Sequence, residues 1–172
     1  MSENTTPEHG TAASVQDSFE LPGAPDQFQR LWTPHRTAYV SSDEESLIVH
    51  RGEHAFVILN LYPYNPGHLL VCPYRHIPFY DDATEAETME IAQLTQLAMK
   101  VLREVSHNDG FNIGINQGKV GGAGIADHLH QHILPRWSGD TNFLPIIAQT
   151  KTMSRTLDDM RVAIAEGFAR LS

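Results

Sequence analysis

The chain has 172 residues, of which 41% are hydrophobic, and this is enough for one solid core in a single domain. Its formal charge of −9 argues against binding to a nucleic-acid backbone, which needs lysine and arginine to neutralise the phosphates. The longest apolar runs are too short to span a bilayer, and the N-terminal region shows no secretory signal, so we expect a cytoplasmic protein without a membrane partner.

Residues 1–29 are rich in Ser, Thr, Pro, Gly and acidic residues, and they show no sustained hydrophobic periodicity. We therefore expect a mobile, disordered N-terminal tail, followed by one domain over residues 30–172. In that domain, the β-rich runs at 46–50 and 55–60 are separated by Arg-Gly-Glu-His and predict a hairpin. A loop with two prolines follows, and the apolar run at 68–74 predicts another buried strand.

A long helix is predicted next, because Thr84 and Glu87 have the spacing of a capping box. Its apolar stripe consists of Ile91, Leu94, Leu97, Ala98, Val101, Leu102 and Val105, and Gly110 is expected to end it. Residues 111–116 alternate strictly and predict a strand with Phe111, Ile113 and Ile115 on one face. A last helix is expected from about Ser154, with Leu157, Met160, Ile164, Phe168 and Leu171 facing the core. Together these elements predict an α+β fold: an antiparallel sheet covered on one side by the long helix and the C-terminal helix.

Three histidines alternate with other residues in the stretch DHLHQHILPRW: His128, His130 and His132. If residues 128–134 form a strand, the three imidazoles project from the same face. One interpretation is a polar strand face in solvent, and a second is a metal site, since imidazole is a common zinc ligand. The third is catalysis on an anionic substrate, with one imidazole as nucleophile and its neighbours as donors to phosphoryl oxygens.

The surrounding residues favour catalysis on a phosphate. Glycines at 118, 121, 122 and 124 come directly before the histidines, and such a loop lets backbone N–H groups approach a phosphate closely. Asp127 and Asp140 lie near the histidines, but no cysteine and no obvious carboxylate completes a metal-binding cluster. We therefore expect no bound metal and no cofactor.

The whole combination resembles the histidine triad (HIT) family of nucleotide-binding hydrolases and transferases. It consists of Asn60, Pro-Gly-His68 eight residues later, Asn116-Gln-Gly, the glycine loop and the three alternating histidines. The resemblance covers about residues 31–150. The segments NLYPYNPGHLLVCPYRH and HLHQHILPRWSGDTNF are most similar to the actinobacterial diadenosine tetraphosphate phosphorylase branch.

The resemblance implies a role for each matching residue. His130 would attack the α-phosphorus and form a nucleotidyl-imidazole, while His68, His128 and His132 would orient it and contact the phosphate oxygens. Asn60 would hold the ribose hydroxyls, Asn116 would lie near the scissile phosphate, and Gly122 and Gly124 would border the nucleotide. Trp137 is a candidate for stacking on a purine. The alternatives are that each asparagine bonds its own backbone at a turn and that Trp137 fills core.

The chain also departs from the common family pattern. The interval from Asn116 to His128 is twelve residues, where the family usually has eleven. Gly124 and Ile125 stand where a Gln-Ser or Gln-Thr pair is common, so a hydroxyl that would protonate the leaving group is missing. This fits a polyphosphate leaving group, which needs little protonation to depart.

The resemblance therefore implies cleavage of dinucleoside polyphosphates, with diadenosine tetraphosphate as the expected substrate. With inorganic phosphate as the acceptor, the products would be ATP and ADP. The alternatives are a hydrolase that uses water, or a non-catalytic module that binds nucleotide or metal. The expected partners are the nucleotide, inorganic phosphate and further copies of the chain in a homodimer or higher homo-oligomer.

Overall fold

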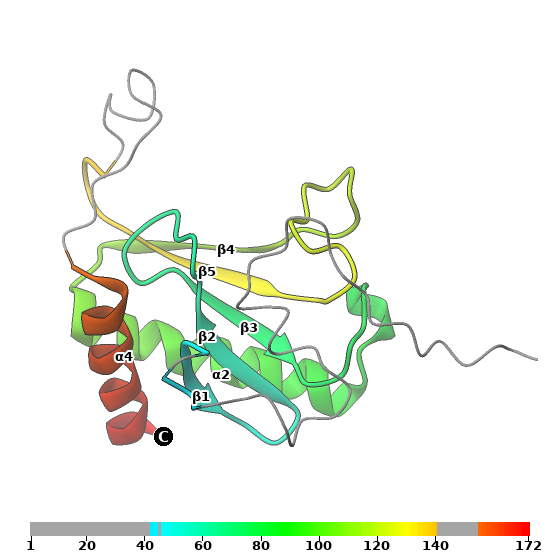
Figure 1. Cartoon of the computed structure of the whole chain (residues 1–172), viewed down its shortest axis with the longest axis horizontal. Coiled ribbons are helices and arrows are strands. Elements are labelled where there is room, and N and C mark those ends of the chain that lie inside the picture. Colours follow the sequence, from blue (N-terminus) through cyan, green and yellow to red (C-terminus); the bar gives the residue numbers. More distant parts are fainter. Residues whose placement is uncertain (1–41, 45, 141–154) are drawn as a thin grey trace, which may run out of the picture.

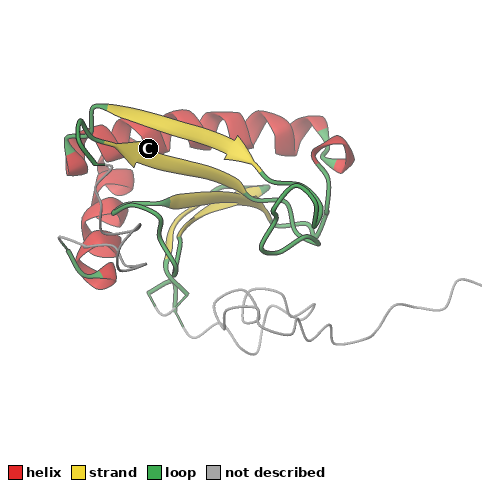
Figure 2. Ribbon diagram, turned by 90° about the horizontal axis from the view of Figure 1, so that it is seen from above, coloured by secondary structure: helices red, strands yellow, loops and turns green. Residues whose placement is uncertain are grey.

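A computed structural model describes residues 42–44, 46–140 and 155–172 of the chain (Figure 1). The predicted N-terminal tail lies outside these residues. In the described part, a five-stranded antiparallel sheet carries a long helix across one face, and a second helix packs at one end of the sheet (Figure 2). This arrangement confirms the predicted α+β fold.

The strands follow the order β1-β2-β3-β5-β4, and every neighbouring pair is antiparallel. Their bounds are β1 Ile48–Arg51, β2 Ala55–Leu59, β3 Leu69–Pro73, β4 Gly110–Ile115 and β5 Gln131–Arg136. The pairing of β1 with β2 confirms the predicted hairpin. Every residue of β2 and β3 is buried, which explains why both strands are continuous apolar runs without alternation.

The long helix α2 spans Glu85–Ser106, and its predicted capping box is present. The Thr84 hydroxyl accepts from the Glu87 N–H at 3.2 Å, and the Glu87 carboxylate accepts from the Thr84 N–H at 2.8 Å. The predicted end at Gly110 is wrong. The helix ends at Ser106 because His107 adopts a left-handed conformation (φ 49°) and its N–H bonds the carbonyl of Arg103.

The second helix, α4, spans Leu157–Leu171 and packs against α2 and β1. Gly167 allows the close approach to α2, since a Cβ at this position would lie 2.7 Å from Cγ1 of Val101. Phe168 is buried and stacks on His50 at a ring-centroid distance of 4.8 Å. Leu171 was expected to face the core, but it is 42% exposed in the last turn. Neither α2 nor α4 is long and apolar enough to cross a membrane.

Strand β4 lies at one edge of the described sheet and pairs only with β5 there. The predicted alternation of its side chains is visible, with Phe111 and Ile115 partly buried against the core. Ile113 lies on the same face of the strand and is 44% exposed, so the predicted apolar face of β4 is only partly covered.

Candidate active site

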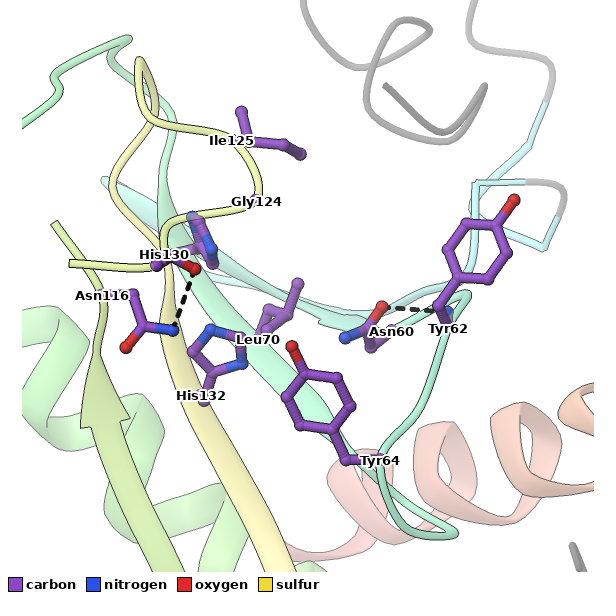
Figure 3. A pocket seen from close by; sticks show the side chains of 10 residues that line it. Asn60, Tyr62, Tyr64, Leu70, Asn116, Gly124, Ile125, His130 and His132 are labelled. Atoms are coloured by element: carbon purple, nitrogen blue, oxygen red, sulfur yellow. Dashed lines mark hydrogen bonds between the residues drawn. The ribbon is translucent and has the colours of Figure 1, made fainter. Parts of the chain in front are cut away.

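A pocket of about 320 Å³ opens between β3, β5 and two loops (Figure 3). Its lining residues are Asn60, Tyr62, Tyr64, Leu70, Asn116, Gly122, Gly124, Ile125, His130 and His132. Six of these were predicted from the sequence as site residues: Asn60, Asn116, Gly122, Gly124, His130 and His132. The volume lies at the lower end of the range for ligand pockets, roughly 300–1,000 Å³.

The first two histidines of the triad do not lie on the strand, although a strand over 128–134 was predicted. β5 begins only at Gln131, and residues 128–130 form an irregular segment in front of it. Two hydrogen bonds hold this segment against the last residue of β3 and the chain that follows it. Nε2–H of His128 donates to the carbonyl of Pro73 at 2.8 Å, and the N–H of Leu129 donates to that of Ile77 at 2.7 Å.

His130 is buried, and the hydrogen bond at its Nδ1 determines its tautomer. Nδ1 lies 2.7 Å from the carbonyl oxygen of His128, and a carbonyl can only accept, so Nδ1 carries the proton. Burial lowers the pKa of His130, which favours the neutral ring. In a neutral imidazole with a protonated Nδ1, the lone pair is on Nε2, which makes Nε2 the ring atom capable of acting as a nucleophile.

The orientation of His132 follows from a chain of hydrogen bonds that begins at His68. Nδ1 of His68 accepts from the N–H of Tyr64 at 3.1 Å and from Nδ2 of Asn60 at 3.2 Å, so its proton is on Nε2. That Nε2–H donates to Nδ1 of His132 at 2.8 Å. Burial lowers the pKa of His132 to about 4, so the ring is neutral at pH 7 and its remaining proton is on Nε2. His132 therefore brings an N–H donor to the pocket.

His68 and His128 support the site and do not line the pocket. Both rings are buried. His68 orients His132, whereas His128 provides the carbonyl that holds His130. The ring of His76 packs edge-on against His128 at 5.0 Å and closes that side. The contacts that the structure shows for these two residues are with other histidines and the backbone, and their contact with phosphate oxygens stays a prediction.

In the glycine loop, residues 117–127, two backbone N–H groups are used within the loop and do not point to a ligand. The N–H of Gly122 donates to the carbonyl of Lys119, and that of Ala123 to Gly118, so both serve the turns of the loop itself. Gly122 has a φ of +80°, a conformation that favours glycine. A Cβ added at Gly124 would meet no atom within 4 Å, so this side of the pocket is open.

The profile of the HIT domain matches residues 41–139, which is more than half of the chain. The chain belongs to the HIT family. A Mycobacterium tuberculosis protein named AP-4-A phosphorylase is 42% identical to it, over 86% of this chain and 88% of that protein. A Dictyostelium discoideum protein named bis(5'-adenosyl)-triphosphatase is 37% identical over 54% of this chain and 61% of that protein.

Solved structures agree with this assignment. A zinc-bound histidine triad family protein from Mycobacterium smegmatis matches with a TM-score of 0.60 and 25% identity, over 73% of this chain and 85% of that chain. A hypothetical histidine triad nucleotide-binding protein from Sulfolobus tokodaii matches with a TM-score of 0.61 and 29% identity over the same shares. In residues 42–44, 46–140 and 155–172 of this HIT protein, no group of three or more His, Cys, Asp or Glu side chains is arranged to hold a metal ion.

The two asparagines expected to bind nucleotide both border the pocket of this HIT protein, and both also bond the chain itself. Oδ1 of Asn60 accepts from the N–H of Tyr62 at 3.0 Å, which is the turn bond considered as the alternative (Figure 3). Nδ2 of Asn116 reaches the carbonyl of Gly122 at 3.5 Å. The contact of Asn116 is long, and its role toward a nucleotide stays a prediction.

Trp137 lies outside this pocket. Its indole N–H donates to the carbonyl of Ser106 at the end of α2, at 3.1 Å, and the side chain is partly buried there. Trp137 therefore lies at the end of α2 and outside this pocket, and its stacking on a purine stays a prediction.

The sequence reasoning missed Tyr62 and Tyr64, which form one wall of the pocket. The Tyr64 ring lies between Asn60 and His132 with its hydroxyl turned toward Leu70, and it is nearly parallel to the His132 ring, 6.1 Å away (Figure 3). The signal in the sequence was the loop LYPYNPG between Asn60 and His68, which carries two tyrosines and was interpreted only as a break between strands.

Proposed function

We propose that this HIT protein cleaves dinucleoside polyphosphates, with diadenosine tetraphosphate as its substrate and inorganic phosphate as its acceptor. The observation that carries the proposal is the tautomer of His130: its Nδ1–H is held by the carbonyl of His128, so the lone pair is on Nε2, and the ring lines the pocket. A neutral imidazole presented in this way is a nucleophile for phosphorus.

In the first step, Nε2 of His130 forms a bond to the α-phosphorus of diadenosine tetraphosphate. The bond from that phosphorus to its bridging oxygen breaks, and ATP leaves. In the second step, an oxygen of inorganic phosphate attacks the same phosphorus, the P–N bond breaks, and ADP forms. Nε2–H of His132 donates to a phosphoryl oxygen and stabilises the charge that develops there.

Two observations support a polyphosphate leaving group. The M. tuberculosis relative is named AP-4-A phosphorylase, and the D. discoideum relative is named bis(5'-adenosyl)-triphosphatase. At positions 124 and 125, glycine and isoleucine line the pocket, so no hydroxyl stands there to protonate the departing group. A polyphosphate leaves as a stable anion without such a donor.

The nucleotides formed in the reaction show whether the acceptor is phosphate or water. Diadenosine tetraphosphate is incubated with the protein in buffers with and without ³²P-labelled inorganic phosphate, and the nucleotides are separated by chromatography. We expect faster cleavage with phosphate, with ATP and labelled ADP as products, because a bound, oriented acceptor has a much higher effective concentration than a diffusing one.

Unlabelled AMP with ATP, at a rate that phosphate does not change, would identify a hydrolase and contradict the phosphorylase assignment. No cleavage in either buffer, together with stoichiometric zinc in the purified protein, would favour the binding module. A preparation of the His130→Ala variant, purified in the same way, is the control for contaminating phosphatases.

We also infer that the protein is a homo-oligomer. Ile113 on the edge strand β4 is 44% exposed, and an apolar residue on an edge strand of the described sheet is suited to contact with a second copy. An Ile113→Lys variant should shift the mass measured by light scattering toward the monomer. The same mass for the variant and the natural sequence would contradict this assembly through β4.

A further inference from the structure

The loop of residues 61–67, the tyrosine loop, forms one wall of the pocket and leads into His68. Its base is closed by the N–H of Asn60, which donates to the carbonyl of His68 at 2.9 Å. Its two tyrosines, Tyr62 and Tyr64, are 64% and 57% exposed, and the Tyr64 ring lies 4.8 Å from the ring of His68. A buried residue of the same loop adds contacts with a more distant part of the chain.

Asn65 is the buried residue of the tyrosine loop that ties it to β5, and only 4% of it is exposed. Its Nδ2 donates to the carbonyl of Pro135 at 3.0 Å and to Oδ2 of Asp140 at 3.1 Å. Its own carbonyl accepts from the N–H of His68 at 3.1 Å. Asn65 thus joins the end of β5 to the residue that orients His132.

The Asp140 carboxylate is itself fixed from several directions. Nε and Nη2 of Arg136 donate to its two oxygens at 2.5 and 2.7 Å, and the N–H of Trp137 donates to Oδ2 at 3.3 Å. The Arg136 guanidinium also donates to Oδ1 of Asn112 on β4, at 2.6 Å. Hydrogen bonding to Arg136 keeps the pKa of Asp140 well below its usual range, so the carboxylate is ionised at neutral pH.

We infer that Asp140 is a positioning residue for the active site: through Asn65 it fixes the tyrosine loop and the backbone of His68. Nδ2 of Asn65 has two hydrogens, and two acceptors face it, so the amide is held in one orientation. The chain of contacts runs from Arg136 and Asp140 to Asn65, then to His68 and on to His132. Through these contacts, the segment Trp-Ser-Gly-Asp140 would help to position the site although it lies outside the pocket. The inference rests on the proposed function only in that the tyrosine loop would border the nucleotide.

The test compares Asp140→Ala, Asp140→Asn, Asn65→Ala and the double variant Asp140→Ala/Asn65→Ala. Turnover of diadenosine tetraphosphate is measured well below the melting temperature of each protein. We expect kcat/KM to fall about tenfold in Asp140→Ala, because a small displacement of positioning groups costs one to two orders of magnitude. Asp140→Asn should retain most of the activity, because its amide oxygen still accepts from Asn65. The double variant should be no worse than the poorer single variant, because both changes break the same contact.

A second measurement does not depend on turnover. The ring N–H proton of His68, which donates to His132, is followed by NMR in ¹⁵N-histidine-labelled protein. We expect its signal to persist in the natural sequence and in Asp140→Asn, and to broaden or disappear in Asp140→Ala. The control is Arg170→Ala, which removes an exposed ion pair with Glu104 between α4 and α2 and should change neither kcat/KM nor the signal.

Two results would overturn the inference. One is an Asp140→Ala protein with a lower melting temperature but the natural kcat/KM and His68 signal, since Asp140 would then only stabilise the fold. The other is additive losses in the double variant, since Asp140 would then not act through Asn65. If the natural sequence does not cleave diadenosine tetraphosphate, the proposed function fails, and the His68 signal alone decides whether Asp140 is a positioning residue.

Discussion

The His130→Ala variant should lose turnover of diadenosine tetraphosphate by roughly 10³-fold or more, as loss of a covalent nucleophile typically does. The change removes Nε2, the atom that would bond the α-phosphorus. Nucleotide binding should persist, because Asn60, Asn116 and His132 also border the pocket. Chromatography of the products measures the rate, and calorimetry with diadenosine tetraphosphate measures the affinity.

A matched control is His107→Asn, which removes an exposed imidazole at the end of α2 and keeps a residue that tolerates the left-handed conformation. Its turnover should equal that of the natural sequence. Mass spectrometry of protein quenched at alkaline pH, where the P–N bond is stable, should find a nucleotidyl adduct in the natural sequence and none in His130→Ala. Near-normal turnover in His130→Ala, with turnover abolished in His128→Ala, would show that the nucleophile is assigned to the wrong histidine.

Acid should destabilise the protein between pH 6.5 and 4 through the buried imidazoles. Burial lowers the pKa of both His128 and His132 to about 4, whereas the ordinary value is 6.5. The folded state therefore resists protonation that the unfolded state accepts. Their contribution to stability is complete above pH 6.5 and is lost as the pH falls through 4. The loss in the free energy of unfolding is about 3 kcal/mol for His128. It is smaller for His132, which is more exposed.

Urea unfolding at pH 8, 6, 5 and 4 measures this loss. The control variant is His128→Gln, because Nε2 of glutamine can replace the donor to Pro73 without titrating. Between pH 8 and pH 4, we expect the free energy of unfolding of His128→Gln to fall by about 3 kcal/mol less than that of the natural sequence. Glu87, whose pKa is lowered to about 2 mainly by its hydrogen bond with Arg75, loses its contribution below pH 4.5 in both proteins. If the free energy of unfolding fell equally with pH in the two proteins above pH 4.5, His128 would not titrate as inferred.

Most of the secondary structure could be predicted from the sequence, because it depends on residues close together in the chain. The capping box at Thr84 and the apolar stripe of α2 are contained within 22 residues. The combination of Asn60, Pro-Gly-His68, the glycine loop and the three alternating histidines resembled the HIT family, and this resemblance implied the set of residues at the site. Asn60, Asn116, Gly122, Gly124 and His132 all border the pocket with His130, as expected from these patterns.

Local patterns failed where a distant part of the chain supplied the deciding contact. The alternation of histidines predicted a strand from 128, but a hydrogen bond from His128 to Pro73, 55 residues away, holds this segment in another conformation. The end of α2 was placed at Gly110 because glycine commonly ends helices, whereas His107 adopts the left-handed conformation instead. Trp137 lies against the end of α2, away from the pocket, which no spacing within the sequence indicates.

The sequence by itself therefore determined the periodic elements, the family and most of the predicted site residues that line the pocket. The tertiary structure decided which nitrogen of each imidazole carries a proton, since this follows from the acceptors and donors that the fold places beside His68 and His130. It also decided the link between Asn65 and Asp140, which lie 75 residues apart. Side-chain periodicity is a property of neighbouring residues, whereas a tautomer or a buried hydrogen bond depends on groups that meet only when the chain has folded.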